Sequence, residues 1–259
     1  MNSDWLVPQW PVPAQVHALC TTRAGGSSMA PFDALNLADH VGDSQLAVAA
    51  NRALLQHAMK ARPVFLSQVH GTAVALLSAS TPSETRADAC LTDQSGVACT
   101  IMVADCLPVL LTNRQGSAVG AAHAGWRGLA GQDGQGILES ALASFAALCS
   151  LDGRRQAAET VVWLGPCIGP NAFEVGEDVR DAFVAHDREA AQMFRRQSGD
   201  KWLADLAGLA RLRLAALGVT QIHGNDGGAA WCTASNPSRY FSHRRDRVSG
   251  RMAACIWLS

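Results

Sequence analysis

Three side chains of metal-ligand type, His70, Cys106 and His123, stand where apolar runs of the chain meet turns. They occur in the segments LSQVHGT, VADCLP and AAHAGWRG. Two imidazoles and one thiolate suit Zn²⁺, and a site with three protein ligands keeps a fourth position for water or substrate. Taken singly, each residue could equally be a buried thiol or a satisfied core imidazole. Together they predict an open, catalytic zinc site assembled from separate segments.

Two carboxylates lie close to these residues in sequence, Asp88 in RADAC and Asp105 beside Cys106. Either could orient a ligand imidazole or carry a proton, and Asp88 could instead cap backbone amides. Because consecutive strand residues face opposite sides, we expect Asp105 to act behind the ligands rather than among them.

A thiol nucleophile is the competing chemistry. Cys106 or Cys167 would supply the thiolate, and His70, His123 or His243 would act as the base. Zinc would occupy the same sulfur that a Cys106 nucleophile needs, so Cys106 cannot conveniently serve both mechanisms. The spacing of the residues leaves the two mechanisms open.

Bulk composition describes an ordinary globular protein. The chain has 259 residues, a net charge of -1 and 17% charged residues, so we expect no general attraction to nucleic acid or membrane. The N-terminal segment MNSDWLVPQWPVP lacks the basic start and apolar core of a signal peptide. The 8 cysteines are scattered through apolar segments, which favours reduced thiols and a cytoplasmic location.

Hydrophobic periodicity predicts alternating helices and strands, typical of a layered α/β protein, and no linker divides the chain into domains. A run of small residues at 117–122 leads to His123, and the segment 97–111 reads as a buried strand ending near Cys106. Helices are expected at 44–60, 137–148, 176–186 and 203–217, and further strands at 63–78, 161–164, 219–223 and 252–258.

Two arginine-bearing regions could bind an anion. The glycine-rich segment GWRGLAGQDGQG after His123 leads into a helix and carries Arg127, and a C-terminal cluster contains Arg239, Arg244, Arg245, Arg247 and Arg251. The glycines do not match the dinucleotide fingerprint and no P-loop lysine is present. A flexible loop and a solvated basic loop are the alternatives.

Several motifs in a fixed order make the sequence resemble the family variously called polyphenol oxidase, laccase-domain or purine nucleoside phosphorylase proteins. They are LNLADHVGD, LSQVHGT, VADCLPVLL, HAGWRG, LGPCIGP, WCTASN and FSHRRDRVSGRMAACIWL. The resemblance spans most of the chain and implies one domain over 1–259, an αββα sandwich of the α/β (α+β) class with mixed sheets. The implied zinc ligands are His70, Cys106 and His123.

The activity that the resemblance implies is phosphorolysis of adenosine, inosine and S-methyl-5'-thioadenosine, with deamination of adenosine as well. Purine nucleosides and phosphate would be the partners. Arg127, Arg244 and Arg245 are candidates for a phosphate cradle, and Asn36 and Gln68 could hydrogen-bond a ribose or base, although such polar residues often satisfy their own backbone.

Two further readings of the chemistry stay open. A thiol or zinc amidohydrolase fits because some relatives are linked to editing of peptidoglycan precursors, and a non-enzymatic zinc module would need a fourth protein ligand. A copper-dependent polyphenol oxidase is a further alternative, because copper could occupy a His/Cys/His site and give weak oxidase activity, but the chain's 8 histidines are too few for a multicopper oxidase centre.

Overall fold

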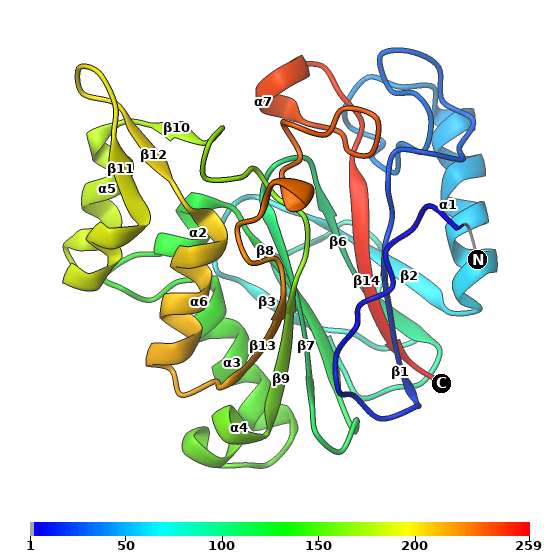
Figure 1. The fold of residues 1–259 in the computed structure, drawn as a ribbon. Helices are drawn as coiled ribbons and strands as arrows, with labels where there is room; N and C mark the ends of the chain where they lie inside the picture. Colours follow the sequence, from blue (N-terminus) through cyan, green and yellow to red (C-terminus); the bar gives the residue numbers. More distant parts are fainter. Residues whose placement is uncertain (1–2) are drawn as a thin grey trace.

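Two stacked β-sheets form the centre of the protein in a computed structural model that describes residues 3–259 (Figure 1). The first sheet has five strands in the order β1 (Val16–Cys20), β14 (Met252–Leu258), β6 (Val97–Val103), β2 (Arg62–Ser67) and β4 (Thr85–Arg86). The second has six in the order β13 (Gln221–Gly224), β9 (Thr160–Leu164), β7 (Leu107–Asn113), β8 (Val119–Ala124), β5 (Ala89–Thr92) and β3 (Val74–Leu76). Both sheets contain parallel and antiparallel pairs.

Helices cover the outer face of each sheet. The helices of the protein are α1 (Gln45–Met59), α2 (Trp126–Ala130), α3 (Ile137–Leu148), α4 (Gly153–Glu159), α5 (Glu177–Val184), α6 (Leu206–Ala216) and α7 (His243–Asp246), with short 3-10 helices η1 (Arg188–Met193) and η2 (Ala229–Trp231). In Figure 1, α1 lies on the side of the five-stranded sheet, whereas α3 and α6 lie on the side of the six-stranded sheet. The expected αββα sandwich of the α/β class is therefore confirmed.

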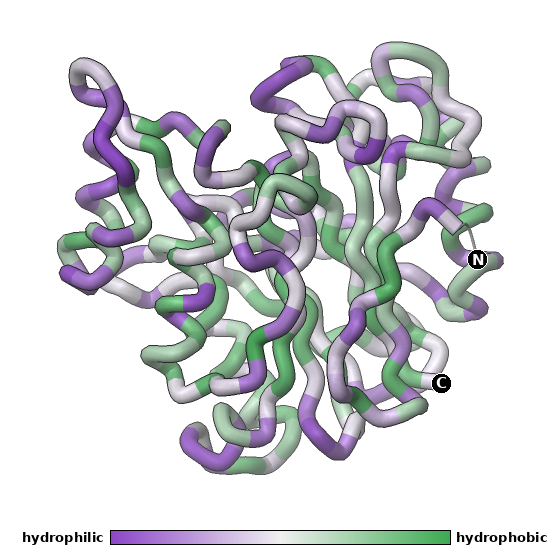
Figure 2. Tube along the Cα trace, viewed as in Figure 1, coloured by the Kyte–Doolittle hydropathy of each residue, from purple (hydrophilic) through white to green (hydrophobic). Residues whose placement is uncertain are grey.

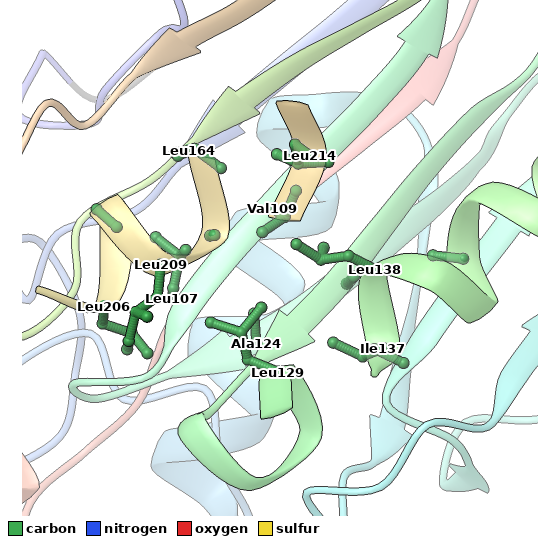
Figure 3. Close-up of a cluster of buried hydrophobic side chains, with 14 of the residues drawn as sticks. Leu107, Val109, Ala124, Leu129, Ile137, Leu138, Leu164, Leu206, Leu209 and Leu214 are labelled. Carbon is green, nitrogen blue, oxygen red and sulfur yellow. The ribbon is translucent and has the colours of Figure 1, made fainter. Parts of the chain in front are cut away.

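The core follows from the alternation of side chains along buried strands. On β7, Val109 and Leu111 face the helices while Leu110 faces the other sheet, which explains why this strand is apolar throughout. Figure 3 shows the helix-side cluster, in which Leu138 of α3 and Leu209 of α6 gather over the sheet. A separate cluster packs α1 against the outer face of the five-stranded sheet.

A small third sheet lies beside α5 and consists of β10 (Glu174–Val175), β12 (Trp202–Ala204) and β11 (Phe194–Arg196). No sequence pattern predicts this sheet, because its strands have only two or three residues. It also explains one incorrect boundary. The helix expected from residue 203 begins at Leu206, after β12 and the capping residue Asp205.

Most other expected elements are confirmed within a few residues. The 137–148 helix and the 252–258 strand have the bounds expected, and Ser44 caps α1 as expected. Two expected strands are wrong as single elements. The 63–78 segment divides into β2 and β3 around a turn at His70, and 97–111 divides into β6 and β7 around Cys106. In both cases the interruption carries a candidate metal ligand.

Hydropathy along the chain agrees with this layering, since the central strands are largely hydrophobic and the longest hydrophilic stretches lie in outer loops (Figure 2). Within residues 3–259, no helix combines the length and apolar character that a membrane crossing needs.

Candidate metal centre and adjoining pocket

The three expected ligands converge at one place. One ligand atom from each of His70, Cys106 and His123 lies within 4.8 Å of the others. The Sγ of Cys106 is 3.6 Å from Nε2 of His70, and the rings of His70 and His123 meet edge to face at 4.7 Å. Tetrahedral zinc ligands lie about 2.0 to 2.3 Å from the metal, so donor atoms spaced in this way suit a shared ion.

Strand pairing explains why these distant residues meet. His123 lies on β8 opposite Pro108 of β7, and Cys106 immediately precedes β7, so both lie at the same end of the strand pair. His70 occupies the turn after β2 and has a left-handed backbone, with φ of 60°.

Asp88 ties the His70 turn to His123. Its carboxylate accepts hydrogen bonds from the backbone N–H groups of Val69, His70 and Gly71 at 2.8 to 3.1 Å, and Nδ1 of His123 lies 2.9 Å from Oδ1. The side chain is fully buried. A carboxylate on Nδ1 leaves Nε2 of the imidazole for a metal, which is the usual support for a histidine ligand. Both roles considered for Asp88, orienting an imidazole and capping amides, occur together.

Asp105 does not join the candidate ligands but contacts the residues around them, as expected. Its carboxylate accepts a hydrogen bond from Thr233 Oγ1 at 2.6 Å and one from the backbone N–H of Arg244 at 2.6 Å. The residue is buried and has a φ of 92°, so the chain has left the strand conformation just before Cys106. Asp105 thereby joins the Cys106 turn to the C-terminal segment that begins α7.

Cys106 and His123 each stabilise the charged form of the other. Burial opposes ionisation of Cys106, but His123 and His70 outweigh it and lower the pKa of this thiol to about 6. Burial likewise opposes protonation of His123, whereas Cys106 and Asp88 raise its pKa to about 9. In the absence of metal the two groups therefore form a thiolate–imidazolium pair. A cation that binds here replaces a proton on His123 and finds the thiolate already formed.

A pocket of about 250 Å³ opens onto the three ligands. The lining residues are His40, Gln68, His70, Met102, Val103, Ala104, Cys106, His123, His243 and Arg251. A second hollow of about 500 Å³ adjoins it and shares His40, Gln68 and Met102. Ligand pockets commonly enclose about 300 to 1,000 Å³, so the two hollows together have room for a nucleoside-sized molecule.

Gly125, a residue not predicted to belong to the site, lies directly against two of the candidate ligands. A Cβ added at this position would stand 2.7 Å from Cδ2 of His70 and 3.0 Å from Sγ of Cys106. Real Cβ atoms do not approach other atoms that closely, so a larger residue must displace the ligands. The HAGWRG motif thus supplies a ligand and also the space that the neighbouring ligands require.

Gly125→Ala is expected to weaken metal binding by on the order of 10- to 100-fold, similar to the loss of a ligand's supporting contact. Its effect on folding should be small, because the ring of the exposed His70 can swing away into solvent. Competition with a chromophoric chelator measures the affinity, and thermal unfolding of the metal-free protein measures stability. Gly71→Ala is the control, since its Cβ would meet nothing closer than 3.5 Å. Wild-type metal affinity in Gly125→Ala would contradict this prediction.

Of the residues expected to bind substrate, Gln68 lines the pocket. Its side-chain amide is paired with the backbone of Met102, donating to the carbonyl and accepting from the N–H, each at 2.8 Å. Asn36 is fully buried and hydrogen-bonds Asp43, Ala38 and the backbone N–H of Arg251. The structure does not bring Asn36 to the pocket surface.

The three arginines expected to cradle phosphate lie outside the pocket lining. Arg127 is exposed and stacks over Trp126 at 4.3 Å. Arg244 donates from Nη1 to the carbonyl of Glu174 and lies over Phe173. Arg245 uses its Nε, Nη1 and Nη2 within the protein. Its acceptors are the carbonyls of Thr233, Ala234 and Tyr240 and the carboxylate of Asp246.

Arg251 is an arginine that does line the pocket. It belongs to the same C-terminal arginine cluster, but it is the member that lines the pocket beside the ligands. Burial lowers the pKa of its guanidinium, while Cys106 and Asp105 act in the opposite direction. Its position was not foreseeable from the motif, because cluster membership does not say which side chain points inward.

Cys167, the other nucleophile considered, does not share this environment. It is almost fully buried, its Sγ accepts a hydrogen bond from Nδ2 of Asn225, and burial raises the pKa of its thiol. A buried thiol with a raised pKa is a poor nucleophile. All 8 cysteines are free, and Cys106 is the one whose pKa is lowered.

Comparison with solved structures supports the same fold. A crystal structure of Neisseria meningitidis protein NMB0706 superimposes with a TM-score of 0.88 at 42% identity, covering 99% of this chain and 100% of that one. YlmD from Geobacillus stearothermophilus gives a TM-score of 0.82 at 30% identity, covering 95% and 92%.

Sequence comparison gives relatives over nearly the whole chain. A Pseudomonas aeruginosa protein named purine nucleoside phosphorylase PA4543 is 49% identical over 259 residues, which are 100% of this chain and 99% of that protein. Escherichia coli purine nucleoside phosphorylase YfiH is 47% identical over 258 residues, 99% of each. The family model described as multi-copper polyphenol oxidoreductase laccase matches residues 17–259. The chain therefore belongs to the multi-copper polyphenol oxidoreductase laccase family, in which several relatives carry the name purine nucleoside phosphorylase.

Proposed function

We propose that the protein is a zinc-dependent purine nucleoside phosphorylase that acts on adenosine, inosine and S-methyl-5'-thioadenosine and also deaminates adenosine. The observation that carries this proposal is the group of three converging donors, His70, Cys106 and His123, open to a pocket. The names of relatives at up to 49% identity support phosphorylase activity. The substrates, the deamination and the identity of the metal are our inference.

The donor set fits zinc. Two imidazoles and a thiolate are ligands that zinc prefers, and the carboxylate of Asp88 on Nδ1 of His123 leaves Nε2 for the ion. When bound, zinc acts as a Lewis acid that can polarise a substrate atom or acidify a water. Copper can occupy the same ligands. Within residues 3–259 this is the one group of three or more such side chains, which supports a mononuclear site over a multicopper centre.

Phosphorolysis makes clear demands on the pocket. A phosphate oxygen forms a bond to C1' of the ribose while the bond from C1' to purine N9 breaks, and the departing base takes up a proton. In deamination the oxygen of water forms a bond to C6, the bond from C6 to the amino nitrogen breaks, and that nitrogen takes up a proton and leaves as ammonia. His40 and His243 line the pocket and are the imidazoles placed to move protons, and Nδ1 of His40 lies 3.4 Å from the carboxylate of Asp39.

The test is phosphate dependence. Zinc-loaded protein incubated with adenosine is expected to release adenine and ribose 1-phosphate only when phosphate is present, and inosine formation should continue without phosphate. Removing the metal with a chelator should abolish both products, and zinc should restore them. Chromatography of the bases and nucleosides measures the outcome. Adenine release that is independent of phosphate would identify a hydrolase instead.

A thiol amidohydrolase is the second candidate, favoured by the thiolate–imidazolium pair of Cys106 and His123. It predicts amide or peptide hydrolysis by the metal-free protein and inactivation by alkylation of Cys106. Loss of activity on chelation would count against it.

We also propose that residues 1–259 form one domain, supported by the core shared between the two sheets, although residues 1–2 lie outside the described part. Reduced cysteines favour the cytoplasm as its location.

A further inference from the structure

We propose that Arg251 is the residue that binds the phosphate co-substrate in this pocket, an inference that rests on the proposed phosphorolysis. The pocket lining contains Arg251 together with His70, Cys106 and His123, and it contains no other arginine among the residues described. An arginine offers a planar pair of N–H donors that matches two phosphate oxygens.

One of the three guanidinium nitrogens of Arg251 is hydrogen-bonded within the protein. Nη1 donates to the carbonyl and hydroxyl oxygens of Ser249, at 2.8 and 3.3 Å, and to the carbonyl of Gly250 at 3.0 Å. Nε and Nη2 have no acceptor among residues 3–259. These two nitrogens form one edge of the guanidinium, so a fixed side chain keeps a two-donor edge free for an oxyanion.

The backbone of Arg251 is anchored just as firmly. Its N–H donates to Oδ1 of Asn36 at 2.9 Å, and its carbonyl accepts from the N–H of Leu37 at 3.1 Å. Asn36 is itself fixed, because its Nδ2 donates to Asp43 and its carbonyl accepts from Nδ2 of Asn51 at 2.8 Å. Asn36 therefore acts as a positioning residue behind Arg251. Asn36 of the LNLADHVGD motif thus serves the pocket through Arg251, whereas His40 of the same motif lines the pocket.

The two adjoining hollows also differ in the charged side chains that line them. The smaller one holds Arg251 and the metal ligands, whereas the larger one is lined by the carboxylates of Asp39 and Glu84, with Arg52 paired to Asp39 at 3.0 Å. A phosphate anion is repelled by the carboxylates and attracted by the guanidinium. The uncharged nucleoside can extend into the larger hollow while phosphate stays beside Arg251.

Arg251→Gln and Arg251→Lys in the zinc-loaded protein test this assignment. Losing a charged two-point contact should raise the KM for phosphate by about 10- to 100-fold, with the KM for inosine changed less than about threefold. Lysine keeps the charge without the paired donors, so it should restore phosphate binding only in part. Arg114→Gln is the control, because this exposed arginine follows the far end of β7.

Direct binding separates this proposal from the proposed function. Inorganic phosphate, compared with chloride at equal ionic strength, should raise the unfolding temperature of the wild type and of Arg114→Gln, and should raise that of Arg251→Gln much less. This result without any phosphorolysis by the wild type would leave the anion site standing and overturn the enzymatic assignment. An unchanged phosphate response in Arg251→Gln, or an equal rise in both KM values, would overturn the role of Arg251.

Discussion

Cys106→Ala is expected to abolish both tight zinc binding and phosphate-dependent release of adenine. The substitution removes one of three converging donors and the negative charge that partners His123. Two neutral imidazoles bind zinc far more weakly than two imidazoles and a thiolate, because the sulfur is the one anionic donor of the three. The fold should persist, since Cys106 is only partly buried and lies in a turn.

Metal content after dialysis and phosphorolysis of adenosine measure this effect. Cys149→Ala is the matched control, because Cys149 is the other partly buried cysteine and follows the end of α3, away from the pocket lining. It should keep wild-type zinc content and turnover. Unchanged turnover in Cys106→Ala would refute a catalytic metal held by this residue.

Asp88→Ala is expected to destabilise the protein by about 3 to 5 kcal/mol, even without metal. Its carboxylate is fully buried and accepts three backbone N–H bonds in addition to its contact with His123. Truncation leaves those amides and a buried imidazole without their acceptor. The His70 turn and the His123 ring then lose their common support, so zinc affinity should fall as well. Chemical denaturation of the metal-free protein measures the loss of stability.

Asp88→Asn removes the negative charge of this side chain but keeps its shape. The variant therefore tests how the contribution of Asp88 to stability depends on pH. Burial alone would raise the pKa of Asp88, but hydrogen bonds from His123, Gly71 and Val69 outweigh it and lower this pKa below its ordinary value of 3.8. The native state therefore binds fewer protons than the unfolded state in acid, so the contribution of Asp88 is complete above 3.8 and lost as pH falls below it.

The asparagine variant should lack this acid-dependent part of the unfolding free energy, so its stability should fall less steeply than that of the wild type. The raised pKa of His123 does not interfere, since its titration between 6.5 and about 9 lies outside the acid range. Equal slopes for wild type and Asp88→Asn below pH 4 would contradict an ionised Asp88 in the native state.

Much of the fold was predictable because its main elements have strong local patterns. The helix Ile137–Leu148 and the strand Met252–Leu258 are long, with apolar side chains at helical or continuous strand spacing. The short strands of the third sheet were missed for the opposite reason, since two or three residues carry no measurable period. The division of 63–78 and 97–111 was missed because residues flanking a turn can be as apolar as the strands themselves.

The candidate site shows the same contrast. The types of His70, Cys106 and His123 are enough to predict ligands, because few side chains bind metals and each lies in a family motif. Arg251, Gly125 and His40 also lie in family motifs, but residues of these types serve many roles, so motif membership alone does not place them beside the ligands. Conversely, Asn36 and Arg245 have suitable chemistry for a substrate, but their polar atoms are used within the protein.

The sequence by itself determined the layered α/β class, the family and the chemical character of a three-ligand site, because these follow from side-chain types and local periodicity. Only the tertiary structure decided which polar groups face the pocket and which support it from behind. Orientation depends on strand register, on turns such as those at His70 and Asp105, and on hydrogen bonds between distant segments, such as Asn36 to Arg251, which are 215 residues apart. No local pattern in a chain encodes contacts over that separation.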